Sequence, residues 1–527
     1  MSITKTFSSM FSDKTLTRKA SLNALASVLD YGTRWLVTFI INPLLVAGLG
    51  DFGYGAWQVL SRLIGYISPA GGRPTQALKW TIASQQASTD YEEKRRQVGS
   101  AIAVWFMFLP LLLLLGGLLA WYVPVWLEAP VELYTSLRWA TMALVGNLIF
   151  TNLAEIPQSV LRGENLGYKR MGLTTLLILM GGGFVGLALY LNQGIVGVAV
   201  ATWVTTACTG ILFFNVARSA VAWFGIAKPV FEGIRKFMGL SGWFLAWNLI
   251  LQLFKAGDVI ILGVFDSAEL VSHYSLTRYI PETIIGVIAI IVFGITPGLG
   301  GILGSGDLKK AAQVRNEIMT ITWFIVTVFG STMLLWNRSF VNLWVGGEYY
   351  AGGISNLLII VMVSQFVFIR NDANIIDLTL DLRKKVWMGL VAAGLSAGLA
   401  VFLVGTLKMG IMGLTIGFIC GQSIISIGYP LIISRVFQVS LSSQLKGAIR
   451  PALITALSFA LVSVLGSSLA VNSWFLLILY GGLTTLLFSI LVFYVGMTRE
   501  QRSNFLRRAR KVLPTERNNN EQPRREE

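Results

Sequence analysis

This 527-residue sequence has little charge, a single histidine and two cysteines. Charged residues make up 13% of the chain and hydrophobic residues 54%, and the mean hydropathy of +0.67 excludes an ordinary soluble protein. Cys208 and Cys420 both lie in apolar runs, and with one histidine in the chain they exclude a disulfide framework and a zinc site. The sequence has no phosphate-binding glycine loop and no pairing of nucleophile and base, so we expect neither a cofactor nor an enzyme.

Long apolar runs are what the sequence has instead. Runs of about 20 residues, the length of an α-helix that crosses a bilayer, recur along nearly the whole chain. We therefore predict an all-α polytopic membrane protein with about 14 transmembrane helices. The predicted spans are 22–47, 54–86, 97–122, 138–161, 172–191, 195–217, 239–264, 269–303, 317–336, 354–380, 387–406, 410–434, 451–470 and 474–497.

Basic residues are concentrated in every second connection between these spans. The alternate connections carry only Arg138, Arg338 and Lys408 and are richer in acidic residues. Because cytoplasmic loops carry an excess of Lys and Arg, this pattern predicts an even number of spans with both termini in the cytoplasm. The net charge of +16 lies in these loops and in the C-terminal tail, so it does not indicate nucleic-acid binding. Residues 1–20 are polar, and we expect no cleavable signal peptide.

The chain also repeats itself after about 216 residues. The corresponding positions are Asp51 and Asp266 (266 − 51 = 215), Ser61-Arg62 and Thr277-Arg278 (277 − 61 = 216), Asp90 and Asp307 (307 − 90 = 217), and Gly194-Ile195-Val196-Gly197 and Gly410-Ile411-Met412-Gly413 (410 − 194 = 216). Each copy holds six predicted spans, an even number, so both copies enter the membrane in the same orientation. A duplicated bundle of this kind is typical of transporters, with a cavity between the two lobes.

This repeat and the charge pattern predict how the chain is divided. The predicted segments are a cytoplasmic N-terminal segment 1–20, an N-lobe 21–217, a linker helix on the inner membrane surface 218–238, a C-lobe 239–434, two further helices within 451–497 and a disordered basic cytoplasmic tail 498–527.

Each copy has an arginine deep in a predicted span. Arg62 follows Asp51 by 11 residues (62 − 51) and Arg278 follows Asp266 by 12 (278 − 266). At about 1.5 Å per residue both lie roughly 16–18 Å below the outer surface, near the bilayer centre. A charge there must face water, a partner or a ligand, and an arginine can bind two phosphate oxygens at once. The alternative is an ion pair: Glu282 is four residues from Arg278, whereas Arg62 has no acidic residue at i±3 or i±4.

The second predicted span carries further polar residues on the face of Arg62. The residues spaced three or four apart on this face are Gln58, Arg62, Tyr66, Pro69, Arg73 and Gln76. We expect Gly71, Gly72 and Pro74 to interrupt the helix, and Lys79 continues the cationic face beyond the break. A broken helix with a cationic face is where a transporter would expose backbone to a cavity.

Other spans contain charged residues that could bind substrate or couple transport to H⁺ or Na⁺. Asp30 and Arg34 lie four apart in the first span and could simply pair with each other. Lys255 in the seventh span is a further candidate cation. The candidates for ion coupling are Asp30, Glu155, Asp258, Glu282, Asp372 and Asp377. A structural ion pair or a helix-end role is the alternative for each of them.

The start of the chain, Asn23…Arg34…Pro43…Gly48-Leu49-Gly50…Tyr54-Gly55, resembles the first spans of the polysaccharide transport family, the Wzx-type repeat-unit flippases. That family belongs to the MOP exporter superfamily, which also includes the MATE drug antiporters and the peptidoglycan-precursor flippases. The paired Asp90 and Asp307 loops and the duplicated Gly-Ile-x-Gly fit the same pattern, and the resemblance covers roughly residues 20–500.

The resemblance implies two MATE-like lobes of six helices, often with two extra C-terminal helices, in the bacterial inner membrane. It implies alternating access that moves an undecaprenyl-pyrophosphate-linked oligosaccharide to the outer leaflet for a lipopolysaccharide or exopolysaccharide, with polysaccharide polymerase or export proteins as partners. Headgroup contacts in the first, second and eighth spans match Arg34, Arg62 and Arg278, and Arg73, Lys79 and Lys255 extend this cationic wall. The last two spans would form a groove for the lipid tail.

Three alternatives remain open. A cation-coupled multidrug antiporter would need an acidic, aromatic cavity, and this face is basic. A peptidoglycan-precursor flippase would share the arginines. A membrane glycosyltransferase, polymerase or ligase would need catalytic residues on sizeable outer loops, but the longest ones, near 123–137 and 337–353, contain no cluster of acids and histidine.

Overall fold

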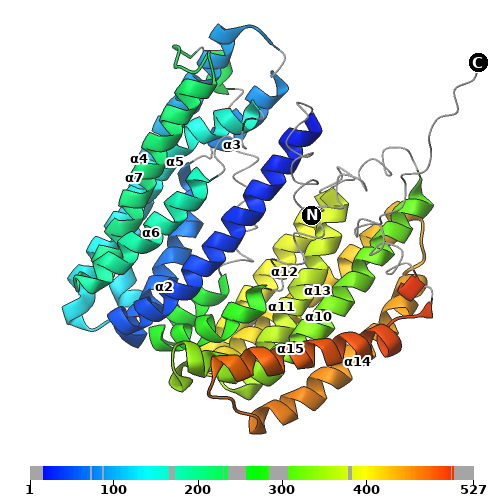
Figure 1. Ribbon diagram of the computed structural model, residues 1–527. Coiled ribbons are helices and arrows are strands. Elements are labelled where there is room, and N and C mark those ends of the chain that lie inside the picture. Colours follow the sequence, from blue (N-terminus) through cyan, green and yellow to red (C-terminus); the bar gives the residue numbers. More distant parts are fainter. Residues whose placement is uncertain are drawn as a thin grey trace, which may run out of the picture. The chain divides into compact units, whose positions relative to one another are not determined.

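The computed structural model describes residues 16–71, 74–85, 88–164, 166, 172–229, 231–235, 257–283, 286, 307–377, 383–499 and 501–503. Every regular element among these residues is helical (Figure 1). The chain divides into two compact units, which we describe separately. Unit 1 comprises Met1–Ser272 and Val404–Gly410, and unit 2 comprises His273–Leu403 and Ile411–Glu527.

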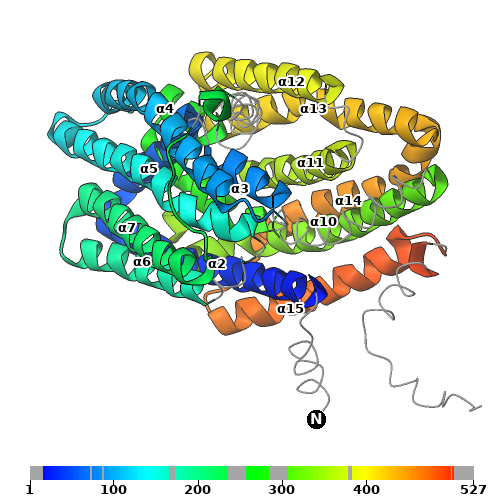
Figure 2. The same cartoon turned by 90° about the horizontal axis from the view of Figure 1, so that it is seen from above.

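Unit 1 is a bundle in which α5 lies alongside α4 and α7 (Figure 2). Its elements are α2 (Leu16–Ile67), a 3₁₀ turn (Ser68–Gly71), α3 (Pro74–Ser84), α4 (Tyr91–Trp126), a 3₁₀ turn (Val131–Leu133), α5 (Tyr134–Gly163), α6 (Leu173–Tyr190) and α7 (Gly194–Ala220). The long element α2 is kinked at Gly50, whose φ of 71° and ψ of 177° are not helical. Because glycine adopts positive φ readily, Gly50 separates two successive helices.

Unit 2 is built around α10, which packs against α11, α14 and α15. Its elements are α10 (Leu308–Trp344), a 3₁₀ turn (Gly347–Tyr349), α11 (Gly353–Asp377), α12 (Arg383–Val401), α13 (Gly410–Phe437), α14 (Leu441–Ser468) and α15 (Trp474–Leu491). A π-helical turn (Phe402–Thr406) follows α12, and another (Val492–Gly496) follows α15.

The predicted fold class is confirmed. Ten helices among the described residues are long and apolar enough to cross a membrane. The first of them, Leu29–Ile67, covers two predicted spans because it contains the Gly50 kink. The fourth predicted span is α5, which is less apolar and not among the ten, and the seventh and eighth lie largely outside the described residues.

The sequence repeat is matched by repeated backbone geometry. Asp90 caps α4 by accepting a hydrogen bond from the Glu93 backbone N–H at 2.9 Å, and Asp307 caps α10 by accepting one from Lys310 N–H at 3.0 Å. Gly194 and Gly410, which begin α7 and α13, have φ values of 57° and 52°. The repeated aspartates and glycines therefore have structural roles as helix caps and turns, which explains their recurrence without a ligand.

The linker after α7 differs from the predicted surface helix. Residues 221–229 are irregular, and only 231–235 are helical among the described part of the linker. Trp223 is 5% exposed, and its indole N–H donates to Glu164 Oε1, which also pairs with Lys94 Nζ at 2.9 Å. Arg95 Nε donates to the Trp223 carbonyl. These bonds hold the linker on α4 and α5, so Trp223 is buried in protein rather than in lipid.

Gly55 permits a close helix contact, and we expect Gly55→Ala to destabilise unit 1. A Cβ at this position would collide with the Ala268 carbonyl oxygen, whereas a Cβ at Gly32, in the helix before the Gly50 kink, would meet no described atom within 4 Å. Overpacking of this kind typically costs about 1–3 kcal/mol. Thermal unfolding of the purified variants in detergent checks this prediction. Gly55→Ala should have a lower melting temperature than the wild type, and Gly32→Ala should have an unchanged one. Equal melting temperatures for both variants would contradict the close contact.

Candidate functional site

The second predicted span is broken at the expected place. The helix that follows Gly50 ends at Ile67, a 3₁₀ turn covers Ser68–Gly71, and α3 begins at Pro74. Proline lacks an N–H and favours the first helical turn, which explains why α3 starts there. The predicted headgroup cation Arg73 lies outside the described residues, within this break.

The cationic face of this span is half-buried above and below the break. Gln58, Arg62 and Tyr66 succeed one another by four residues and are each half-buried, as is Lys79 in α3. Gly163 of α5 holds α3 close, since a Cβ there would lie 2.7 Å from Ile82 Cβ. The sequence-predicted Arg62 and Lys79 thus sit on consecutive segments of one interrupted helix.

The polar face of α5 packs against the break. A Cβ at Gly71 would lie 2.7 Å from Asn152 Nδ2, so only a glycine lets the chain pass this side chain closely. Glu155 is exposed, and its Oε2 accepts a hydrogen bond from the buried Thr75 hydroxyl at 3.3 Å. The ion-coupling candidate Glu155 is therefore brought to the start of α3.

In the first span, the two candidates Asp30 and Arg34 do not pair with each other. Asp30 accepts a hydrogen bond from the Thr175 hydroxyl of α6 at 3.3 Å. Arg34 is exposed and forms no ion pair with a described residue. The mutual pairing of Asp30 and Arg34, which the sequence left open, is absent from this part of the chain.

In unit 2, Arg278 is bound by residues of its own helix. Its Nη2 lies 2.9 Å from Glu282 Oε1, and its Nη1 donates to the Tyr274 hydroxyl at 2.7 Å. The guanidinium also lies over the Tyr274 ring, 5.4 Å from its centroid. The ion pair that the sequence offered for Arg278 as an alternative to substrate binding is present.

The remaining candidates are partly outside the described residues. Asp258 is buried, and its Oδ1 accepts a hydrogen bond from the Val259 backbone N–H at 2.8 Å. Lys255 and the side chain of Asp377 lie outside the described residues. No group of three or more His, Cys, Asp or Glu that could hold a metal ion occurs among the residues that the structure describes.

Asp372 takes part in a buried ion pair that the sequence analysis did not find. Its two oxygens accept bonds from Arg315 Nε and Nη2, each at 2.9 Å, and Arg315 Nη1 donates to Gln444 Oε1 at 2.8 Å. The side chains of Arg315 and Asp372 are 7% and 5% exposed. Arg315 and Asp372 are 57 positions apart in the sequence, so no local spacing connects them.

Two acidic groups outside the predicted spans have shifted pKa values. Burial raises the pKa of Asp266, opposed in part by the positive charge of Lys408. Burial also raises the pKa of the Tyr350 hydroxyl, opposed by Arg338 and by a hydrogen bond with Asn356. Both lie at helix connections.

Solved structures with the same fold are transporters. The chain resembles the lipid II flippase MurJ in an inward closed conformation, with 14% identity over 89% of this chain and 98% of that chain and a TM-score of 0.67. It also resembles an inward-facing multidrug resistance MATE family transporter of the MOP superfamily, with 15% identity over 78% of this chain and 99% of that chain and a TM-score of 0.60. A MOP superfamily transporter from Pyrococcus furiosus, described by a binding pocket of reverse polarity, matches with 16% identity over 81% of this chain and 96% of that chain and a TM-score of 0.50.

The fold is that of the MOP superfamily transporters. At these identities the likeness shows the fold alone. No protein-family model matches the sequence, and neither does any curated protein.

Proposed function

We propose that this protein is a membrane transporter that flips an undecaprenyl-pyrophosphate-linked oligosaccharide from the cytoplasmic to the outer leaflet by alternating access. The flipped oligosaccharide would be used to build an exported surface polysaccharide. The protein would lie in the bacterial inner membrane, with both termini in the cytoplasm. The observation that carries this proposal is Arg62: a half-buried arginine in an apolar helix, 9 residues before Gly71 at the helix break (71 − 62 = 9).

The chemistry of the second span supports a phosphate-bearing substrate. A guanidinium at membrane depth is stabilised by water, a partner or an anionic ligand, and its planar donors suit two phosphate oxygens. Lys79 continues the positive charge on α3, and Arg34 contributes an exposed guanidinium on the first helix. We assign Arg62, Lys79 and Arg34 as the main headgroup contacts, with Arg73 and Lys255 as further candidates. Arg278 is a weaker candidate, because Glu282 and Tyr274 already bind it.

Ion coupling is assigned most readily to Glu155. Its carboxylate is exposed and hydrogen-bonded to Thr75 beside the break, so a change in its charge would act directly on the start of α3. Asp30 and Asp258 remain further candidates. Asp372 and Glu282 each neutralise a neighbouring arginine, which favours a structural role for both.

Two other substrate classes are suggested by the solved structures that share this fold. A lipid II flippase shares it, so a peptidoglycan precursor, which also carries a pyrophosphate, would suit the same arginines. A multidrug resistance transporter also shares it, but a cationic drug would be repelled by Arg62 and Lys79. The basic face thus disfavours the cationic drug, and substrate tests are needed to separate the two pyrophosphate-linked lipids.

The experiment that tests this proposal measures lipids in a deletion strain. We expect undecaprenyl-pyrophosphate-linked oligosaccharide to accumulate on the cytoplasmic leaflet and to return to its normal level when the wild-type gene is restored. Accumulation of the peptidoglycan precursor instead would favour the second substrate. Unchanged lipids together with sensitivity to cationic dyes would overturn the proposal in favour of a drug antiporter.

A further inference from the structure

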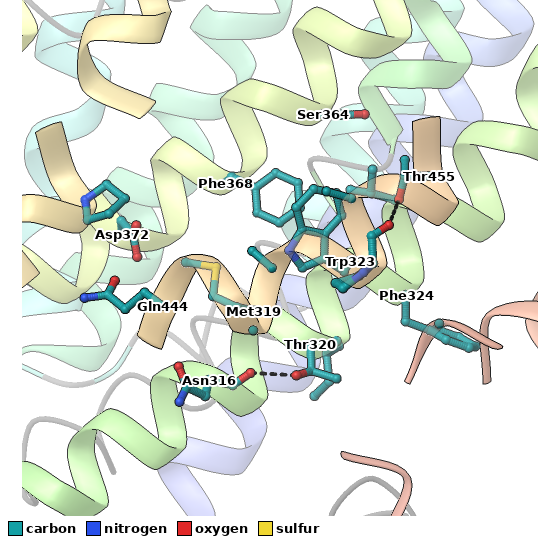
Figure 3. A pocket seen from close by; sticks show the side chains of 18 of the residues that line it. Asn316, Met319, Thr320, Trp323, Phe324, Ser364, Phe368, Asp372, Gln444 and Thr455 are labelled. Atoms are coloured by element: carbon teal, nitrogen blue, oxygen red, sulfur yellow. Dashed lines mark hydrogen bonds between the residues drawn. The ribbon is translucent and has the colours of Figure 1, made fainter. Parts of the chain in front are cut away.

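Unit 2 contains a large cavity that the proposed headgroup site does not use. It has a volume of about 1380 Å³ and lies between α10, α11, α13 and α14 (Figure 3). Ligand sites are typically concave and mainly apolar, with a few placed polar groups. Arg278, the only member of the predicted headgroup set described in unit 2, is not among the lining residues. We call this cavity the α10–α14 slot.

The slot is elongated along α10 and α14, which run parallel and are hydrogen-bonded to each other at two levels. Arg315 donates to Gln444 at one level, and the hydroxyls of Thr327 and Thr455 share a hydrogen bond of 2.6 Å at the other. These levels are 12 residues apart along α10 (327 − 315), or about 18 Å. Between them α14 contributes Gly447, Ala448 and Ala452, whose small side chains leave the slot open beside α10. The slot therefore has the length of an extended hydrocarbon chain.

The walls of the slot are apolar and aromatic. Trp323 and Phe368 pack with ring centroids 4.4 Å apart, and Phe324 and Phe459 also line the slot. Thr320 lines it near its polar end and accepts a hydrogen bond from Gln501 Nε2, so the C-terminal segment borders the slot there. A flexible apolar chain would bury its surface against these rings.

The charges of the slot disfavour an anionic occupant. Arg315 is the only cation among the described lining residues, and its guanidinium is bonded to both oxygens of Asp372 and to Gln444. A phosphate could use Arg315 only by breaking this buried ion pair. Glu317 adds a second carboxylate to the lining. A pyrophosphate headgroup is therefore excluded from this end of the slot.

Two buried amide atoms in the lining have no hydrogen-bond partner among the residues that the structure describes. Gln444 Nε2 is an unused donor, and its orientation is fixed because Oε1 accepts from Arg315. Gln365 Oε1 is an unused acceptor, since the amide is oriented by Nε2, whose two hydrogens are shared among the Ile419 carbonyl at 3.1 Å, Ser423 Oγ at 3.3 Å and Ser426 Oγ at 3.0 Å. Buried donors and acceptors are normally satisfied, and a hydroxyl group can serve either of these atoms.

We propose that the α10–α14 slot binds an uncharged single-chain amphiphile, an alkyl chain ending in a hydroxyl-bearing head, of which a monoacylglycerol is an example. The chain lies against Trp323, Phe324 and Phe459, and a hydroxyl of the head accepts a hydrogen bond from Gln444 Nε2 at the end of the slot where Arg315 and Asp372 pair. This lipid is a bound component of unit 2. The assignment does not depend on which substrate the protein transports.

Photocrosslinking of the full-length protein in phosphatidylcholine vesicles tests this proposal. The probe is a monoacylglycerol with a diazirine in its chain, and labelled peptides are identified by mass spectrometry. We expect labelling within 319–324 of α10 and 448–456 of α14. Ala452→Trp fills the slot and should lower this labelling about tenfold. Leu457→Trp adds the same ring to the same helix at a position that is 70% exposed, so it should leave labelling unchanged. Ala448→Phe provides a second filling variant if Ala452→Trp does not fold.

Competition with unlabelled lipids decides the chemistry of the occupant. Excess monoacylglycerol should remove the labelling, and lysophosphatidic acid of the same chain length should compete about tenfold less well. Equal competition by the anionic lipid, or equal labelling of the two tryptophan variants, would overturn the proposal. Competition by a polyprenyl phosphate alone would also overturn it and would assign the slot to the tail of the transported lipid.

Discussion

Arg62→Ala is expected to abolish transport while leaving the protein folded. Arg62 is half-buried in an apolar helix close to the break at Gly71, where a guanidinium can meet a phosphate. Removing both donors of its fork should lower the transport rate by about 100-fold, equivalent to about 2.8 kcal/mol. Removing a charge from membrane depth does not penalise insertion, so the expression level and melting temperature should stay near those of the wild type. The measurement is rescue of the lipid accumulation in the deletion strain.

Arg62→Lys serves as the matched control. It keeps the charge but not the planar fork, so we expect transport between that of the alanine variant and the wild type. Normal flipping by Arg62→Ala would remove Arg62 from the headgroup site. Loss of transport together with a lowered melting temperature would instead indicate a structural role.

Asp372→Ala is expected to destabilise unit 2 strongly. Arg315 would keep its charge in a site where only 7% of its side chain is exposed, and Gln444 would be its one remaining partner among the described residues. Breaking a buried ion pair on one side typically costs about 3–5 kcal/mol. The measurement is thermal unfolding of the purified protein in detergent, and a marked drop in melting temperature is expected.

Two comparisons isolate the pair. The double variant Arg315→Leu with Asp372→Leu removes both charges. It should have a higher melting temperature than Asp372→Ala, because no unpaired charge stays buried. Glu92→Ala breaks the exposed pair of Glu92 and Arg96, which are 58% and 44% exposed, and should change stability by no more than about 1 kcal/mol. If Asp372→Ala melted normally but transported without an ion gradient, Asp372 would be a coupling residue and not a structural one.

Local patterns in the sequence predicted the fold class and the break in the second span. Apolar run length fixes the number of helices that can cross a bilayer, and Gly71 with Pro74 interrupts a helix wherever it occurs. The repeat was also visible, because Asp90 and Asp307 must each accept a backbone N–H at the start of a helix. These features depend on neighbours within a few positions along the chain.

Contacts between distant residues could not be predicted in this way. Asp30 has a plausible partner four residues away in Arg34 but is hydrogen-bonded to Thr175, 145 positions later. The residues around Trp223 have the composition of a membrane-surface helix, but Trp223 is buried against Lys94 and Glu164. A single sequence carries the spacing along one helix, whereas these partners depend on which helices pack together.

The polar contacts between α10 and the last two helices bear on how this protein can be engineered. Thr327 bonds with Thr455, Trp336 Nε1 donates to Thr484, and Ser339 accepts from the Val471 backbone N–H. A shortened chain ending near residue 440 would turn these groups, and Arg315, toward hydrocarbon. A version without α14 and α15 would therefore need apolar replacements on α10 before it could be expressed, because these two helices cover polar groups of unit 2.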